Sequence, residues 1–296
     1  MLLEKRCARL QSFPPVHWKE TVLRCDSKRE DLVVERDGKY KHIIVEQEGP
    51  ITIVTINRPA VYNALHQDAH LELHDVFDRF AADPDQWVAI ITGAGEKAFC
   101  AGNDLKHQAG GGERGWGTSG FGGLSHRFDL TKPVIAAVNG FAMGGGFEIA
   151  LACDLIIAAE NATFALPEPS VGLAATAGGL LRLPGEIGMK RAMGIILTGR
   201  RVAASEGLLL GFVNEVVAEG QALSAARRWA EGILKLSPMS IRASKQVALR
   251  GYDMPLDQAL NEQAELPTVK AMLSSTDFVE GPKAFAEKRK PIWSGR

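Results

Sequence analysis

The sequence predicts an α/β protein whose last third is helical. Three continuous apolar runs have the length of strands, at 88–93, 133–140 and 154–160. Runs without polar alternation are typical of strands covered on both faces. Beyond Arg182 the strand signals nearly stop, and amphipathic helix spacing follows. We therefore expect an N-terminal, loosely attached extension over 1–38, an α/β core over 39–200, and a helical segment over 201–296.

The elements follow from local patterns. Two β-branched runs at 42–49 and 51–59, separated by Glu-Gly-Pro, predict two strands joined by a turn. Residues 63–80 then carry apolar side chains at helical spacing. The segment 107–123 is too rich in glycine for a helix or strand, and long loops inside compact domains often carry function. With Pro238 and Pro255 as breakers, the C-terminal helices are predicted at 222–236, 239–250, 256–272 and 280–288.

Composition excludes several classes of protein. The 296 residues carry a net charge of −1 without a basic stripe, which disfavours nucleic acid as a partner. The most apolar long stretch, 141–159, contains Glu148 and Asp154, which argues against a membrane span. The four cysteines form no CxxC pair, so neither a disulfide framework nor a zinc site is expected. We expect a cytoplasmic protein, and the mildly Arg-rich N-terminus leaves the mitochondrial matrix as an alternative.

Three glycines, Gly144 to Gly146, follow an apolar strand and precede a helical run. Glycines at a helix N-terminus let backbone N–H groups approach an anion, and the helix dipole adds positive charge there. Such an N–H could stabilise an oxyanion in a water-poor pocket. The alternative is that the glycines only permit close packing of helix on strand.

Two carboxylates accompany this feature. Glu148 falls in the first turn of the predicted helix, where the dipole alone favours an acid. Glu168 follows a proline in an apolar stretch, where an unpartnered carboxylate is costly. Two carboxylates beside an oxyanion site suit general acid and base catalysis.

Other motifs have simpler interpretations. The G-x-G-x-x-A pattern at 93–98 lacks the long helix and the acid that dinucleotide binding requires. His66, His70 and His74 lie at helical spacing and could ligate a metal, but a solvated helix face is the preferred interpretation because the alternate positions carry the leucines, so no functional metal is expected. Cys100 is interpreted as a packing residue.

Trp116 and Phe121 lie in the glycine-rich segment. They either cover an apolar ligand or pin the loop to the core.

Taken together, these segments resemble the enoyl-CoA hydratase/isomerase (crotonase) family. The resemblance runs from about Tyr40 to the C-terminus, and within the family it is strongest to the carnitinyl-CoA dehydratase branch. Its motifs are NRP…NAL at 57–65, KAFCAGNDLK at 97–106, NGFAMGGGFEIALACDL at 139–155 and FALPEPSVGL at 164–173.

The resemblance implies a spiral of ββα units, a C-terminal helical segment that forms homotrimers or dimers of trimers, and an acyl-CoA substrate without a cofactor. It implies an oxyanion hole from the backbone N–H groups of Asn103 and Gly145. Glu148 would help activate water for attack at Cβ, and Glu168 would exchange the proton at Cα. The remaining residues that it assigns to substrate or CoA binding are Ala101, Asp104, Leu105, Lys106, Gly144, Gly172, Trp116, Phe121, Phe285 and Lys288, the last two often reaching a neighbouring subunit's CoA.

Three departures from the family pattern concern the ligand. Asn103 replaces a frequent alanine, the spacer 60–62 lacks a lysine often used for CoA phosphates, and 175–179 differs from the usual Pro-Gly-Ala-Gly-Gly. The last change borders the acyl pocket and leaves the acyl specificity open. Hydration or dehydration of an enoyl-CoA, carnitinyl-CoA among the candidates, is the leading hypothesis. Isomerisation or other thioester chemistry, and CoA-ester binding with little turnover, are the alternatives.

Overall fold

The structure is a computed structural model that describes residues 34–36, 38–113 and 115–296. Its strands are β1 Val34–Arg36, β2 Ile43–Glu48, β3 Ile51–Ile56, β4 Val88–Gly93, β5 Ala98–Cys100, β6 Val134–Val138, β7 Phe141–Met143, β8 Leu155–Ala159, β9 Thr163–Ala165, β10 Val202–Ala203 and β11 Glu215–Val217. Its α-helices are α1 Gln67–Ala82, α2 Leu105–Ala109, α3 Gly145–Ala152, α4 Gly179–Ile187, α5 Met189–Ile196, α6 Ala204–Leu210, α7 Ala222–Leu234, α8 Pro238–Gly251, α9 Leu256–Glu262, α10 Pro267–Leu273 and α11 Thr276–Ala286. Short 3-10 helices are η1 Pro59–Val61, η2 Phe121–Gly123, η3 Glu168–Val171 and η4 Gln263–Glu265.

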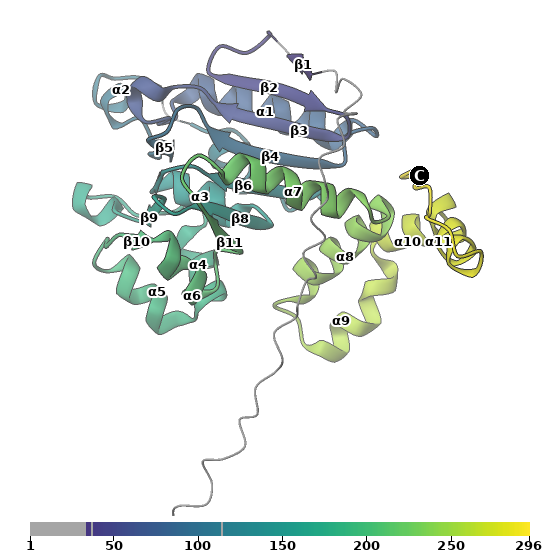
Figure 1. The fold of residues 1–296 in the computed structure, drawn as a ribbon. Coiled ribbons are helices and arrows are strands. Elements are labelled where there is room, and N and C mark those ends of the chain that lie inside the picture. The colour runs from purple at the N-terminus through teal and green to yellow at the C-terminus, as the bar shows by residue number, and fades with distance from the viewer. Residues whose placement is uncertain (1–33, 37, 114) are drawn as a thin grey trace, which may run out of the picture. The chain divides into compact units, whose positions relative to one another are not determined.

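The strands form two sheets (Figure 1). The larger has the order β1-β2-β3-β4-β6-β8-β11 and the smaller the order β10-β9-β7-β5. β4, β6 and β8 are parallel neighbours, and each is followed in the chain by a strand of the smaller sheet, β5, β7 and β9. The chain thus repeats strand–strand–helix units, which confirms the predicted spiral.

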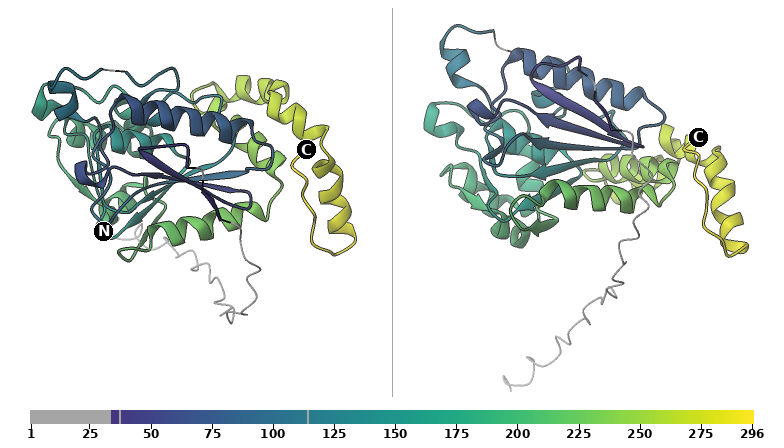
Figure 2. Two further views of the ribbon diagram at one scale, coloured as in Figure 1. Left: turned by 90° about the horizontal axis from the view of Figure 1, so that it is seen from above. Right: turned by 45° about the horizontal axis from the view of Figure 1, so that its top comes forward.

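Helices cover both faces of the larger sheet, as the continuous apolar strands require. On one face α1 packs Leu73 and Phe77 against the sheet, within a core that also includes Phe147 of α3. On the other face four alanines of α7 pack on Ile53 and Ile90, and their small size lets the helix approach closely. Figure 2 shows α1 and α7 on opposite sides of these strands.

The helix predicted over 63–80 begins later, at Gln67, so that part of the prediction is wrong. Asn63 is fully buried with a φ of 57°, and its Oδ1 accepts the Arg58 N–H at 2.9 Å. Its Nδ2 donates to two backbone carbonyls between the end of β4 and β5, at 3.0 and 2.7 Å. These bonds hold a turn where periodicity alone indicates helix, and His66 then caps α1.

Other boundaries also differ from the predictions. The glycine-rich segment 107–123 is not all loop, because its first residues end α2 and its last form η2. The single helix expected over 256–272 is divided into α9, η4 and α10, since Pro267 starts a new helix. Of the expected N-terminal extension, residues 1–33 and 37 lie outside the described residues, and the backbone of 34–36 pairs with β2. Within the described part of the chain, no helix is both long and apolar enough to cross a bilayer.

Candidate active site

A cavity of about 570 Å³ opens where the second sheet meets α1, α2 and α3. Walls come from the start of α1, the 101–108 segment, the glycine-rich segment, the start of α3 and residues 167–177. Most of the residues that the sequence singles out line this one cavity: Ala101, Asn103, Asp104, Leu105, Trp116, Phe121, Gly144, Gly145, Glu148 and Glu168. Segments far apart in the sequence therefore meet at a single site.

Glu148 is buried in the first turn of α3 and is only 3% exposed. Its Oε1 accepts the backbone N–H of Gly179 at 2.9 Å. Burial, together with the charge of Glu168, raises the pKa of this carboxyl to about 7, against the hydrogen bond from Gly179. A carboxyl with this pKa can both take and give a proton near neutral pH.

Glu168 begins η3 and projects toward the N-terminus of α3. A Cβ on Gly144 would lie 2.6 Å from Glu168 Oε1, so the carboxylate sits directly over this glycine. Burial raises the pKa of Glu168 as well. Its buried Oε2 has no hydrogen-bond partner among the described residues, which leaves that atom for a ligand in the cavity.

Each glycine of the triplet has its own neighbour. A Cβ on Gly145 would lie 2.3 Å from the ring of Phe121, and one on Gly146 would lie 2.0 Å from the carbonyl oxygen of Cys100. Gly144 has a φ of +54° and accommodates the carboxylate of Glu168. The packing interpretation therefore applies to Gly146, whereas Gly144 and Gly145 border the cavity. Burial raises the Cys100 thiol pKa to about 12, as expected of a packing residue.

Asn103 and Gly145 both line the cavity, and the backbone N–H group of each is free of the nearest hydrogen-bond ladder. Asn103 forms an isolated parallel bridge with Leu65, made by the neighbouring Gly102 carbonyl and Asp104 N–H. In such a bridge the N–H of the central residue points to the opposite side, away from Leu65. Gly145 is the first residue of α3, so its N–H has no acceptor within the helix. The two residues lie close together: Gly102, which precedes Asn103, approaches Gly145 so closely that a Cβ on it would lie 3.0 Å from the Gly145 nitrogen.

Asp104 lines the cavity, yet its carboxylate is already engaged. Oδ1 accepts the His107 N–H at 3.1 Å and caps α2, and Oδ2 accepts Arg58 NH2 at 3.0 Å. This buried pair joins the 57–65 motif to the 97–106 motif. The side chain of Asn103 is held similarly, by donation to Gln108 Oε1 at 2.6 Å.

Four predicted residues do not line the cavity. Lys106 is exposed on α2, and Gly172 ends η3 with its N–H directed to backbone carbonyls, that of Glu168 included. Phe285, near the end of α11, is 87% exposed, and Lys288 just beyond is exposed too. Their assignment to CoA binding stays a prediction.

The solvated helix face predicted for the three histidines of α1 is wrong at His70. His70 is 2% exposed and lines the cavity, whereas Leu71 beside it is 49% exposed. Its ring centroid lies 4.4 Å from that of Phe121, and its Nδ1 accepts the Gly122 N–H at 3.1 Å. The glycine-rich segment folds back onto α1 and buries this histidine, a contact without any local signal in the sequence.

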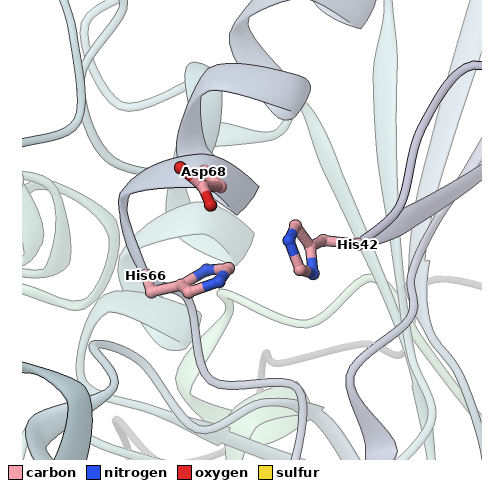
Figure 3. Close-up of side chains that lie close together, drawn as sticks. All are labelled: His42, His66 and Asp68. Atoms are coloured by element: carbon pink, nitrogen blue, oxygen red, sulfur yellow. The ribbon is translucent and has the colours of Figure 1, made fainter.

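A second cluster lies at the start of α1, where His42, His66 and Asp68 converge (Figure 3). Their ligand atoms all lie within 4.8 Å of one another. The surroundings disfavour a cation, because the cluster is at the positive end of the α1 dipole. Burial and the positive charge of nearby Arg58 lower the pKa of His66, and the same charge repels a cation. We therefore assign no metal to this cluster.

Comparisons with known proteins agree with this geometry. The sequence profile of the family described as enoyl-CoA hydratase/isomerase matches residues 46–296. A carnitinyl-CoA dehydratase of Citrobacter koseri is 44% identical over 252 residues, which cover 84% of this chain and 96% of the relative. The crystal structure of an enoyl-CoA hydratase from Mycobacterium tuberculosis H37Rv matches with a TM-score of 0.82 and 40% identity, covering 87% of this chain and all of that one.

A carnitinyl-CoA hydratase from Mycobacterium avium has also been solved. It is 41% identical, covers 87% of this chain and 100% of its own, and matches with a TM-score of 0.69. These matches confirm the fold and the resemblance that the motifs predict. The chain belongs to the enoyl-CoA hydratase/isomerase family.

Proposed function

We propose that this protein adds water across, or removes water from, the Cα=Cβ bond of an enoyl-CoA thioester. The observation that carries the proposal is the pair Glu148 and Glu168, which line one cavity and both have a raised pKa, Glu148 being buried and Glu168 half-buried. Hydration needs a base for the water and an acid for the carbon skeleton, and two neighbouring carboxyls with raised pKa can supply one of each. Relatives named as hydratases and dehydratases support the same reaction.

In the hydration direction, the thioester carbonyl accepts the N–H groups of Asn103 and Gly145. Glu148 takes a proton from water as the oxygen attacks Cβ, and Glu168 gives a proton to Cα. Negative charge develops on the thioester oxygen during attack, and donors fixed in a buried site stabilise it most at that stage. Dehydration uses the same groups in reverse.

The acyl-CoA passes along the wall formed by Ala101 and Leu105, with Lys106 beside the nucleotide part. We propose no cofactor, because general acid–base chemistry with an oxyanion hole accounts for the reaction. Carnitinyl-CoA and crotonobetainyl-CoA are candidate substrates, supported by the relatives that carry the former name. Short enoyl-CoA esters fit the same chemistry.

Assembly through the segment 201–296 is proposed as a homotrimer or a dimer of trimers. Several large apolar side chains of this segment are exposed in the single chain, as expected of an interface. They include Leu249, Tyr252, Leu256, Phe278, Val279, Phe285 and Ile292.

The test is the loss of conjugated-thioester absorbance with crotonyl-CoA and crotonobetainyl-CoA, for the native protein and for Glu148→Gln and Glu168→Gln. Hydration predicts decay that either substitution lowers at least about a hundredfold, because each removes one proton-transfer group. An isomerase would tolerate one of the two changes. CoA-ester binding without decay for either ester would overturn the proposal.

A further inference from the structure

Among the residues that line the cavity, His70 has a polar atom that the proposed reaction does not use. Nε2 of His70 is buried and has no hydrogen-bond partner among the described residues. Leaving a buried donor or acceptor unpaired is energetically costly, so such an atom in a binding cavity points to a ligand group.

The protonation state of His70 follows from its contacts. Burial, with the charges of His66 and Arg58, lowers its pKa to about 4, so the ring is neutral at pH 7. Nδ1 accepts the backbone N–H of Gly122 at 3.1 Å, which requires a lone pair on that nitrogen. The single ring proton is therefore on Nε2. His70 thus offers one neutral N–H donor.

Phe121 locates this donor relative to the reacting atoms. Its ring lies 4.4 Å from the His70 ring, measured between centroids, and contacts Gly145 so closely that a Cβ there would lie 2.3 Å from it. His70 is therefore one aromatic ring away from the proposed oxyanion donor. The neighbouring wall is formed by Trp116, whose ring centroid is 6.4 Å from that of His70.

We propose that His70 forms a hydrogen-bonding subsite that selects acyl chains bearing a neutral oxygen acceptor beyond Cβ, a hydroxyl, ether or carbonyl group. The inference rests on the proposed hydratase function. A carboxylate fits less well because Glu148 and Glu168 share the cavity. A quaternary ammonium has no atom that can accept the N–H, so this subsite does not favour a betaine.

Because Nε2 is buried, an acceptor reaches it only when a neighbouring side chain moves aside. We assign this movement to Trp116. It is 36% exposed and stands between Gly115 and Gly117, both with positive φ. His70 itself is held in place by its ring contact with Phe121 and its hydrogen bond from Gly122.

Two substitutions of His70 test the roles of its two ring nitrogens separately. His70→Asn keeps an oxygen near the position of Nδ1 for the Gly122 N–H and removes the donor. His70→Gln places an amide N–H near the position of Nε2. His74→Asn is the matched control, since His74 lies one turn further along α1, pairs with Asp78 and does not line the cavity.

The experiment measures kcat/KM for two isosteric pairs, 4-hydroxybut-2-enoyl-CoA with pent-2-enoyl-CoA and 4-methoxybut-2-enoyl-CoA with hex-2-enoyl-CoA. We expect the native protein to prefer the oxygen member of at least one pair about tenfold or more. His70→Asn should lose this preference, measured as the ratio of the two kcat/KM values within a pair, His70→Gln should retain part of it, and His74→Asn should retain all of it.

Equal ratios in the native and His70→Asn proteins, or a native preference for the hydrocarbon esters or for crotonobetainyl-CoA, would overturn the subsite. If His70→Asn does not fold, the ratio in the native protein and the response of His70→Gln decide the matter. Crotonyl-CoA is the reference in every assay. If the protein hydrates crotonyl-CoA but shows no preference for the oxygen-bearing esters, only the subsite is refuted. If it does not hydrate crotonyl-CoA, the proposed function itself is refuted.

Discussion

The carboxylate of Glu168 occupies the space that any side chain at position 144 would need. A Cβ on Gly144 would lie 2.6 Å from Glu168 Oε1, and the φ of +54° at Gly144 is one that L-residues rarely adopt. Because Gly144 has no side chain, the Glu168 carboxylate can pack against the N-terminus of α3, and the position of this helix end therefore restricts the position of the carboxylate.

Gly144→Ala should reduce the hydration rate at least about a hundredfold, because the methyl group displaces the Glu168 carboxylate from the reacting carbon. The strained φ should also cost about 1–2 kcal/mol of stability. Crotonyl-CoA turnover and denaturant unfolding measure the two effects. Gly194→Ala is the control, since Gly194 is helical and a Cβ there would have nothing within 4 Å, and it should be active and slightly more stable. A fully active Gly144→Ala protein would contradict the proposed role of Glu168.

The raised pKa of Glu148 makes stability depend on pH in a defined direction. Burial raises this pKa from 4.5 to about 7, so the folded protein binds the proton more tightly than the unfolded chain. The resulting stabilisation is complete below pH 4.5 and is lost as pH rises to about 7. Its size is about 3 kcal/mol, as the pKa difference implies.

Glu148→Gln removes this dependence and keeps an oxygen for the Gly179 N–H. The stability of Glu148→Gln relative to the native protein should therefore increase by about 2–3 kcal/mol between pH 5 and pH 8. Denaturant unfolding of both proteins at the two pH values measures the change. An equal difference at both values would show that the folded-state pKa of Glu148 is near its usual range.

Much of the site could be predicted because its signals are local. The glycine triplet before an apolar helix, with an acid in the first turn, leads directly to Gly145 and Glu148 at the cavity. The periodicity of α1 wrongly predicts that His70 is solvent-exposed. Leucine and histidine alternate there, and which of them is buried depends on the glycine-rich segment that packs against α1. The direction of the Asn103 N–H likewise depends on a bridge to Leu65, which spacing along the chain does not reveal.

Substitution of Asp104 shows whether this residue has a structural role or a role in CoA binding. Its carboxylate pairs with Arg58, whose side chain is 15% exposed, so Asp104→Ala leaves a largely buried guanidinium without its carboxylate and should destabilise the protein by about 3 kcal/mol. The KM for the CoA ester should change less than the stability does. Asp104→Asn, which can still cap α2 and accept from Arg58, should recover part of the loss. A large increase in KM at unchanged stability would instead indicate that Asp104 contacts CoA.

Substitution of Phe285 and Lys288 tests whether a neighbouring subunit completes the site. Both are exposed and absent from the cavity wall of their own chain, so we expect any contact with CoA to be made to the site of another copy. The double variant Phe285→Ala, Lys288→Ala should raise KM severalfold, and most at low ionic strength, because an exposed cation binding phosphate is screened by salt. Lys290→Ala, a nearby exposed cation, is the control and should leave KM unchanged.

Mixing makes this test decisive. Glu148→Gln subunits have inactive sites but keep Phe285 and Lys288, whereas the double variant keeps its carboxylates. If neighbours supply the CoA contacts, co-refolded mixed oligomers should contain active sites with the native KM, because a Glu148→Gln subunit then serves the site of its neighbour. Light scattering should give the mass of three or six chains, the assembly on which such complementation depends. A mixture with only the high KM of the double variant would show that both residues act, if at all, within their own chain.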